Sequence, residues 1–589
     1  MFRSIRCPLA AALVLLSLAA AGRAESILDH LPPDAKGFAL VRNVEAANAK
    51  IEKFLKIFEE LTDSPLPAPW PFIKAATGLG EGLNEQGDAL IALLSGPDGG
   101  DEPRPMLLVA VADYAKFAAS ISGDPSGEIC RVTIAGEEVL AARRGSYAML
   151  MNVEHRPVME SILASDPTAA ASLAPLADWM ATTDLSLVLT PMGVDVLTKL
   201  GQSTLAEQRA QLRDQTTDPA LAAMLKQYQQ GLEMYELVLG FLGAEVNVAA
   251  VGLSIDEATN VRVSKRMVLE QDGQMARWGD APAPSQPPLA GFPAEPFVFG
   301  GGGPTPSTWG EAMASFARKM TERFAKESGF EKFDDDQWKK VEESWKSVMQ
   351  GIHSTSFVML PGEKADPLVS NVFYVVKVDD AEHYLQASRE SYELWNSLLE
   401  SSTSDLGAMM KYEFQDVEVA GKKGLLMTSD MSKVADDAQL PMFGAAMNSI
   451  FGEDGKFRIY LIAADKTTIV TALASTERVA KAIDYAMAGE TGLAQSADVQ
   501  TTVKLLEPGA SWQVFVSPQG TVQWGSRLAT LLLAQFGGTA PDVPDYPDSP
   551  PVGFSWTLTG GQLHAEMVWP IETLDGLAAY IKKSQGDDQ

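Results

Sequence analysis

Few residues of this chain have the types and spacing that a metal site requires. The chain has five histidines, and it contains neither His-Glu-x-x-His nor Cys-x-x-Cys. Zinc sites are built from several such ligands at short spacing, so the sequence predicts no metal and no cofactor. The acidic run Asp334-Asp335-Asp336 resembles the start of a calcium loop, but Lys339 stands where that loop needs glycine. We interpret the run as a helix N-terminus, where the helix dipole favours negative charge.

Nucleophilic catalysis requires a Ser or Cys beside a base. Neither Gly-x-Ser-x-Gly nor Ser-x-x-Lys occurs in the chain. Cys130 begins a predicted strand, where it reads as a small buried hydrophobe. A catalytic pair around His353 or His383 stays open as an alternative. The lack of a recognisable motif favours a protein that is not an enzyme, and we assign no catalytic residue.

A run of four glycines is a candidate for phosphate binding. It follows a predicted strand and precedes a predicted helix, which is the usual setting of phosphate-binding loops. The Lys-Ser/Thr of a P-loop is missing, and Pro304 and Pro306 intervene. We therefore interpret the run as a flexible or tightly turned loop. Its members stay candidate ligand-binding residues: Gly300, Gly301, Gly302 and Gly303.

Two Pro-x-Gly turns are the clearest recurring feature. Thr190-Pro191-Met192-Gly193 and Ser517-Pro518-Gln519-Gly520 each end an apolar run and open a predicted helix. Proline ends the hydrogen bonding of a strand and glycine supplies an unusual backbone angle, so the recurrence indicates shared topology. Alternatively, both turns present backbone N–H groups to an anionic ligand. On that hypothesis the candidate ligand-binding residues also include Pro191, Gly193, Pro518 and Gly520.

Tryptophans are concentrated in the second half of the chain, and secreted sugar-binding sites use such rings. However, Trp338, Val341, Trp345 and Met349 keep helical spacing. That spacing favours core packing over a binding site.

Further matches between the halves occur in the same order along the chain. Each half has a strand followed by Asp, an Ala-Gly hairpin turn and a Gly-x-Ser in its closing hairpin. These are Asp113 and Asp379, Ala135-Gly136 and Ala420-Gly421, and Gly252 and Gly553. Ordered self-similarity predicts an internal duplication.

The short turns favour antiparallel pairing, and several predicted strands lead into capped helices. We therefore predict an α+β fold of two tandem, internally duplicated domains. Each would be a mostly antiparallel sheet with helices packed on one face. The domains span residues 25–278 and 289–589, joined by the Pro-rich linker at residues 279–288.

The start of the chain has the features of a secretory signal peptide. Arg3 and Arg6 precede an apolar run from Leu9 to Ala21, and Gly22-Arg23-Ala24 supplies the small residues of a cleavage site. That run is too short to span a membrane, so residues 1–24 are expected to be removed. No later run is apolar enough to span a bilayer. We therefore predict an exported protein, periplasmic or extracellular, with no membrane span after cleavage.

The net charge limits the classes of partner that the protein can bind, and the cysteine content limits its disulfides. The formal net charge is −30, and so acidic a surface repels nucleic acid and anionic lipid headgroups. Cleavage of the leader would leave Cys130 alone, so no intrachain disulfide is expected.

The opening segment, L-P-P-D-x-x-x-F-x-x-V-x-N from Leu31 to Asn43, and the strand-then-capped-helix units carry a resemblance. They are similar to uncharacterised exported bacterial proteins of a domain-of-unknown-function family. The resemblance implies an envelope location and carries over no catalytic residue. The leading hypothesis is a non-enzymatic binding or structural protein of the bacterial cell envelope, whose partner is another envelope protein or an extracellular ligand. The alternatives are a secreted hydrolase with dispersed catalytic residues and a periplasmic carrier or chaperone for an apolar ligand.

Overall fold

The computed structural model of the chain describes most of its 589 residues. The described residues are 26–59, 66–95, 104–165, 171–213, 231–232, 235–236, 238–278, 280, 282–306, 309–310, 314–315, 318, 334–363, 366–400, 411–430, 450, 455–535, 538–539 and 543–586. The predicted signal peptide lies outside them. The sequence also predicts a helix near Trp309 to Phe324 and a long helical region from Leu205 to Leu242. Most of the first and much of the second lie outside the described residues.

The described residues form an α+β fold with one 19-stranded sheet. Its strands are β1 (Ala35–Val41), β2 (Ala89–Leu94), β3 (Arg104–Ala110), β4 (Ile129–Ile134), β5 (Glu137–Arg144), β6 (Tyr147–Asn152), β7 (Leu185–Leu189), β8 (Val246–Ile255), β9 (Val261–Leu269), β10 (Phe299–Pro304), β11 (Ile352–Met359), β12 (Val372–Val378), β13 (Glu413–Val419), β14 (Lys422–Asp430), β15 (Lys456–Ala463), β16 (Thr468–Leu473), β17 (Trp512–Val516), β18 (Val552–Thr559) and β19 (Gln562–Trp569).

The helices include three single-turn 3₁₀ segments and one longer 3₁₀ segment that runs into α6. They are η1 (Ile27–His30), α2 (Val44–Ile57), α3 (Pro69–Thr77), α4 (Tyr114–Ser120), η3 (Val153–His155), α5 (Arg156–Ala164), η4 (Ala171–Leu176), α6 (Ala177–Thr182), α7 (Pro191–Arg213), η5 (Met275–Trp278), α10 (Asp335–Met349), α11 (Ala381–Glu400), α15 (Thr476–Ala488), α16 (Ala497–Val503), α17 (Pro518–Gln535) and α18 (Ile571–Gly586).

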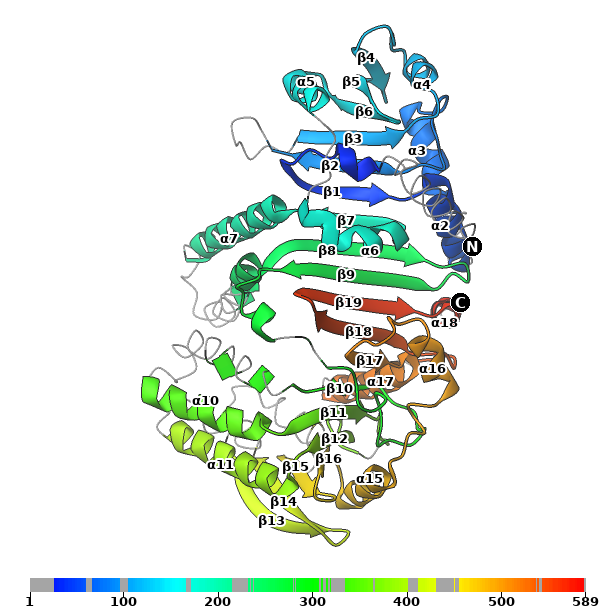
Figure 1. The fold of residues 1–589 in the computed structure, drawn as a ribbon. Helices are drawn as coiled ribbons and strands as arrows, with labels where there is room; N and C mark the ends of the chain where they lie inside the picture. Colours follow the sequence, from blue (N-terminus) through cyan, green and yellow to red (C-terminus); the bar gives the residue numbers. More distant parts are fainter. Residues whose placement is uncertain are drawn as a thin grey trace, which may run out of the picture.

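Every neighbouring pair in the sheet is antiparallel, as the short turns predict. The spatial order is β4-β5-β6-β3-β2-β1-β7-β8-β9-β19-β18-β17-β10-β11-β12-β16-β15-β14-β13. In Figure 1 the sheet runs down the picture from β4 to β13, and the red hairpin β18-β19 adjoins the green β9 at its middle. The predicted domain boundary falls between β9 and β10, and strands from both sides of it belong to this one sheet.

Local sequence accounts for many of the element ends. Asp113 caps α4 by accepting a hydrogen bond from the N–H of Lys116, and Asp334 caps α10 through a capping box, which confirms the predicted helix start. The Ala135-Gly136 turn joins β4 to β5 with φ of 53° and 85°. Ala420-Gly421 joins β13 to β14 with φ of 51° and 72°. Positive φ at both central residues matches the twist of a two-residue hairpin.

Helices cover both faces of the sheet, so the prediction that they pack on one face is wrong. On one face, which we call the inner face, Leu108 and Leu140 pack with Met159 and Ile162 of α5. On the opposite, outer face, Leu150 packs with other side chains against Phe117 of α4. Successive residues of a strand point to opposite faces, and runs such as Leu107–Ala110 are apolar at every position. Such strands must be covered twice.

The same two-sided burial occurs in the second half. On the inner face, Ile462 and Val470 pack with Val479 and Ile483 of α15. On the outer face, Ile352, Val376 and Ile469 form a cluster with Ala381 of α11. Helices α10 and α11 also pack on each other through Trp338, Val341 and Leu398, so the helical spacing of Trp338 and Val341 does reflect core packing.

The glycine run forms strand β10 and is not a loop. Gly300 to Gly302 pair with β11 on one side and β17 on the other. A Cβ at Gly303 would lie 2.6 Å from Cγ of Trp512, whose Nε1 donates a hydrogen bond to the carbonyl oxygen of Pro304. Because glycine has no side chain, the indole of Trp512 can lie directly against the backbone of β10. A run of identical residues has no alternation, so its strand character is invisible in the sequence.

Helix α11 is capped by Asp380, which accepts hydrogen bonds from the N–H groups of Glu382 and His383. The preceding Asp379, which the sequence matched with Asp113, is not the cap.

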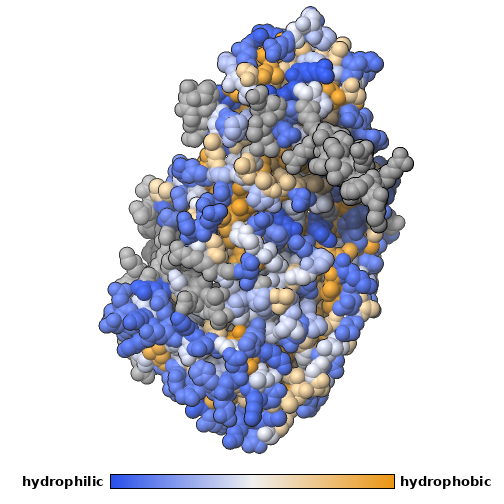
Figure 2. All heavy atoms as spheres, viewed as in Figure 1, coloured by the Kyte–Doolittle hydropathy of each residue, from blue (hydrophilic) through white to orange (hydrophobic). Residues whose placement is uncertain are grey.

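None of the described helices is both long and apolar enough to cross a membrane. In the view of Figure 2, hydrophilic residues cover most of the coloured surface and hydrophobic residues form smaller patches among them.

Candidate functional site

The centre of the sheet carries a row of charged and polar side chains on its inner face. Strand β9 supplies Arg262, Ser264 and Arg266, and β19 supplies His564 and Glu566. Glu566 pairs with Ser264 and His564 pairs with Arg266 in the strand register. Because side chains of a strand alternate between faces, these five point to the same side. We call them the seam, since they join the N-terminal strands to the C-terminal ones.

Glu566 is a buried member of the seam, with 3% of its side chain exposed. Its carboxylate accepts hydrogen bonds from Oγ of Ser555, at 3.0 Å, and from the backbone N–H of Glu507. Nη1 of Arg262 lies 3.5 Å from its Oε2. Arg262 also donates to the carbonyl oxygen of Leu505. A buried carboxylate is costly without such partners, and here three neighbours supply them.

Glu507 is the second acidic partner. Nη1 of Arg266 lies 3.0 Å from its Oε2, and Nδ1 of His564 lies 3.6 Å from its Oε1. The nearby imidazole of His564 and the charge of Arg266 lower the pKa of Glu507 to about 2, although burial acts in the opposite direction. Nε of Arg266 is buried and has no hydrogen-bond partner among the described residues.

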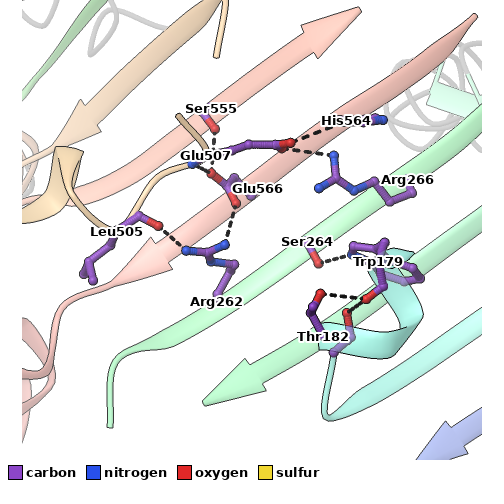
Figure 3. A network of polar contacts seen from close by, with 11 residues as sticks. Trp179, Thr182, Arg262, Ser264, Arg266, Leu505, Glu507, Ser555, His564 and Glu566 are labelled. Carbon is purple, nitrogen blue, oxygen red and sulfur yellow. Dashed lines mark hydrogen bonds and ion pairs between the residues drawn. The ribbon is translucent and has the colours of Figure 1, made fainter. Parts of the chain in front are cut away.

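Short helix α6 forms the wall of the site on the N-terminal side. Nε1 of Trp179 donates a hydrogen bond to Oγ of Ser264 at 2.9 Å, and Thr183 donates to the carbonyl oxygen of Trp179 at 2.7 Å. Gly252 of β8 permits this close approach, since a Cβ there would lie 2.5 Å from atoms of Trp179 and Thr183. Figure 3 shows the two arginines pointing from β9 toward the carboxylates, with the α6 residues on the other side.

A cavity of about 290 Å³ lies over the seam, between α6 and the chain at Leu505. Its lining includes the cations Lys50, Arg262 and Arg266. Each has a carboxylate partner, because Lys50 donates to Asp184 at 2.6 Å and the two arginines pair with Glu566 and Glu507. We call this space the seam cavity. It offers many hydrogen-bonding groups, and its charges are paired except for Asp256, which accepts hydrogen bonds from Asn260 and forms no ion pair with a described residue.

The Pro-x-Gly turns lie elsewhere and are occupied by internal contacts. The N–H of Gly193 donates to Oγ1 of Thr190, and the N–H of Gly520 donates to Oγ of Ser517. A Cβ at Gly193 would overlap the carbonyl oxygen of Lys36, and one at Gly520 would overlap that of Phe297.

The structure does not bring the two turns together. Pro191 and Gly193 start α7 beside the beginning of β1, whereas Pro518 and Gly520 start α17 just before β10. Six strands separate β1 from β10, which is roughly 30 Å at the usual strand spacing. The glycines of β10 lie near the turn at Pro518 and Gly520, and not near the turn at Pro191 and Gly193.

The histidine singled out by sequence has an acidic partner. Nε2 of His353 lies 2.6 Å from Oδ1 of Asp379, and the two side chains are 58% and 70% exposed. A neighbouring open hollow is lined by both residues together with Lys377 and Thr467. Among the described residues, no hydrogen bond joins His383 to His353 or Asp379. Its backbone N–H donates to Asp380.

The seam residues were not recognisable as a site in the sequence. Arg262, Ser264 and Arg266 alternate with Val263 and Lys265 in β9, so the strand has no clean polar-apolar alternation that would mark this face. His564 and Glu566 alternate with apolar residues in β19, as the solvent-facing side of an ordinary hairpin does. The available signal was that β9 carries basic residues and β19 carries an acidic residue at alternate positions, although the two strands are far apart in the sequence. Their pairing could not be inferred from that pattern alone.

Among the residues that the structure describes, no three His, Cys, Asp or Glu side chains converge as they would around a metal ion. Comparison of the chain with protein-family models, with curated proteins and with solved structures finds no match.

Proposed function

We propose that this chain is an exported, non-enzymatic binding protein of the bacterial envelope and that its ligand occupies the seam cavity. The observation that carries the proposal is the pairing of each cation in the cavity lining with a carboxylate. Such a lining can donate and accept hydrogen bonds, and it does not require a charged ligand. Ligand pockets span roughly 300–1,000 Å³, so a cavity of about 290 Å³ suits a small molecule. The ligand class is therefore a small, uncharged, hydroxyl-rich molecule such as a sugar or polyol.

Export rests on the predicted signal peptide and on the resemblance of the opening segment to exported bacterial proteins. The acidic composition is consistent with a freely solvated protein that avoids nucleic acid. The polar lining of the seam cavity favours a polar ligand over the apolar ligand of the carrier hypothesis.

We further propose that the two halves derive from one duplicated unit. Outward from the seam, the N-terminal strands run β9-β8-β7-β1-β2-β3 and the C-terminal strands run β19-β18-β17-β10-β11-β12. The capping hydroxyls of Thr190 and Ser517 make the same bond at the same place. An experimental structure tests this proposal: Thr190 should fall on Ser517 when these strands are superposed, and a mismatch of the strands would refute duplication.

Ligand binding is tested by thermal shift and calorimetry with glucose, myo-inositol and glycerol, with acetate and ethylammonium as charged comparisons. The variant Thr182→Trp should fill the cavity, because Thr182 is exposed and lines it. Thr530→Trp is the matched control, since Thr530 is also an exposed helical threonine that donates to a carbonyl four residues earlier. A neutral polyol should bind the wild type and Thr530→Trp, and lose binding in Thr182→Trp. Equal binding by all three proteins, or binding by none, would refute the site.

A secreted hydrolase is the second candidate, and the contact of His353 with Asp379 favours it. A carboxylate can orient a histidine that acts as a general base. If this function is correct, purified protein should hydrolyse a chromogenic ester and His353→Ala should abolish the activity. Activity that His353→Ala leaves intact would assign it to another site or to a contaminant.

A further inference from the structure

A second cavity, of about 360 Å³, lies on the inner face in the C-terminal half. It is bounded by α15, by the segment at Phe292–Glu295 and by the chain following β11. We call it the α15 cavity. Its floor is apolar and well buried, since Phe292, Val358, Phe373 and Leu493 each expose 5% or less of their surface. Such a floor can accept the hydrocarbon part of a ligand.

The rim of the α15 cavity is acidic. Four carboxylates line it, against the two cations Arg478 and Lys481. Both cations have partners inside the rim: Arg478 lies 3.6 Å from Glu363 and 3.4 Å from Asp366, and Lys481 lies 3.4 Å from Glu477.

One rim carboxylate is left over. Glu295 forms no ion pair with a described residue. Glu363 and Asp366 share the guanidinium of Arg478, and the side chain of Glu363 is 82% exposed. The guanidinium of Arg527 also lies beside Asp366 and donates a hydrogen bond to its carbonyl oxygen. Glu295 is therefore an uncompensated negative charge at the mouth, and the exposed Glu363 is only partly compensated by Arg478. A positive group placed there would be attracted, although partial exposure weakens the attraction.

The N-terminus of α15 opens on this cavity, and a helix N-terminus by itself favours an anion. Here Oγ of Ser475 accepts a hydrogen bond from the N–H of Arg478. The acidic rim also adds negative charge around the opening. An anion entering the cavity would meet Glu295 and the exposed Glu363 before it reached the helix.

We propose that the α15 cavity binds a small organic cation, with its apolar body on the floor and its ammonium group beside Glu295 and Glu363. Tyr485 contributes an aromatic side chain to the wall. This site is separate from the seam cavity, because it shares no lining residue with it. Its ligand also differs in carrying a charge, so the two sites can be tested independently.

Calorimetry with 2-phenylethylammonium tests the proposal on the full chain. Two further probes separate the contributions: 3-phenylpropionate has a similar body with the opposite charge, and ethylammonium has the charge with almost no body. The double variant Glu295→Gln/Glu363→Gln removes the two exposed rim charges without touching the floor. Glu45→Gln/Glu81→Gln, two exposed carboxylates in the N-terminal half, is the matched control.

The wild type and the control should bind 2-phenylethylammonium more tightly than either other probe. The rim variant should bind it about fivefold to tenfold more weakly, as expected for the loss of two partly exposed charges. Equal binding of 3-phenylpropionate would overturn the charge assignment, and equal binding of ethylammonium would overturn the role of the floor. No binding by the wild type, or unchanged binding by the rim variant, would overturn the site.

Discussion

Arg266 of β9 and Glu507, which precedes β17, meet across the middle of the sheet with Nη1 and Oε2 3.0 Å apart. The arginine comes from the N-terminal half and the carboxylate from the C-terminal half. In the same way, Arg262 of the N-terminal half pairs with Glu566 of the C-terminal half. Opposite charges on facing strands favour their pairing, so the seam helps to join two sets of strands into one sheet.

Glu507 should make the stability of the fold depend on acid pH. Its pKa falls from an ordinary value of 4.5 to about 2, so the ionised form stabilises the fold above about pH 4.5. This contribution is lost as the pH falls through 2. Because about a third of the side chain is exposed to screening solvent, we expect Glu507→Gln to cost about 1–2 kcal/mol at pH 7. Urea unfolding at pH 7 and near pH 2.5 measures the difference, which should shrink at the lower pH.

The control for this experiment is Glu418→Gln, which changes an exposed residue of edge strand β13. It should leave stability nearly unchanged at both pH values. A cost for Glu507→Gln that is the same at both would contradict the pairing.

Glu566→Ala should be strongly destabilising. The carboxylate is buried and accepts hydrogen bonds from Ser555 and from the backbone of Glu507. Its removal leaves these donors and Arg262 without their acceptor, so we expect a cost of about 3 kcal/mol or more in the free energy of unfolding. Glu566→Gln should cost less, because an amide oxygen can still accept. Chemical denaturation measures both, with the exposed Glu413→Ala of β13 as control; similar costs for Glu566→Ala and Glu413→Ala would argue against a buried network.

Gly520→Ala should destabilise the protein by about 3 kcal/mol or more, because the added Cβ would overlap the carbonyl oxygen of Phe297. Gly525 lies in the same helix with nothing within 4 Å of the position of its Cβ. Gly525→Ala should therefore be neutral or stabilise by up to about 1 kcal/mol, as alanine favours a helix. Thermal unfolding of the two variants compares them directly. Equal melting temperatures would show that α17 does not pack on this backbone.

A stack of tryptophans on the outer face should give a characteristic near-ultraviolet circular dichroism signal. The ring of Trp556 lies 5.1 Å from that of Trp309 and 6.2 Å from that of Trp512, with interplanar angles of 21° and 8°. Neighbouring indoles at such distances couple their transitions. Trp556→Phe removes the middle ring and should abolish most of this signal, whereas Trp395→Phe in the α10–α11 contact should remove much less. Equal losses would contradict the stack.

The sequence by itself determined the local elements. Asp113 before α4, the Ala-Gly turns and the strand-to-helix turns at Thr190 and Ser517 are set by residues a few positions apart. Capping bonds and positive backbone angles depend on such near neighbours. The alternation and short turns also predicted an antiparallel α+β fold, which is confirmed.

The tertiary structure decided which strands meet and what covers them. Alternation places Arg262 and Arg266 on one face of β9, but it does not reveal that β19 lies beside them or that α6 covers them. The glycines of β10 carry no pattern at all and become a strand only through their neighbours β11 and β17. Pairing between strands hundreds of residues apart depends on contacts throughout the sheet, and no short stretch of sequence records them. The seam and its cavity therefore exist only in the folded chain.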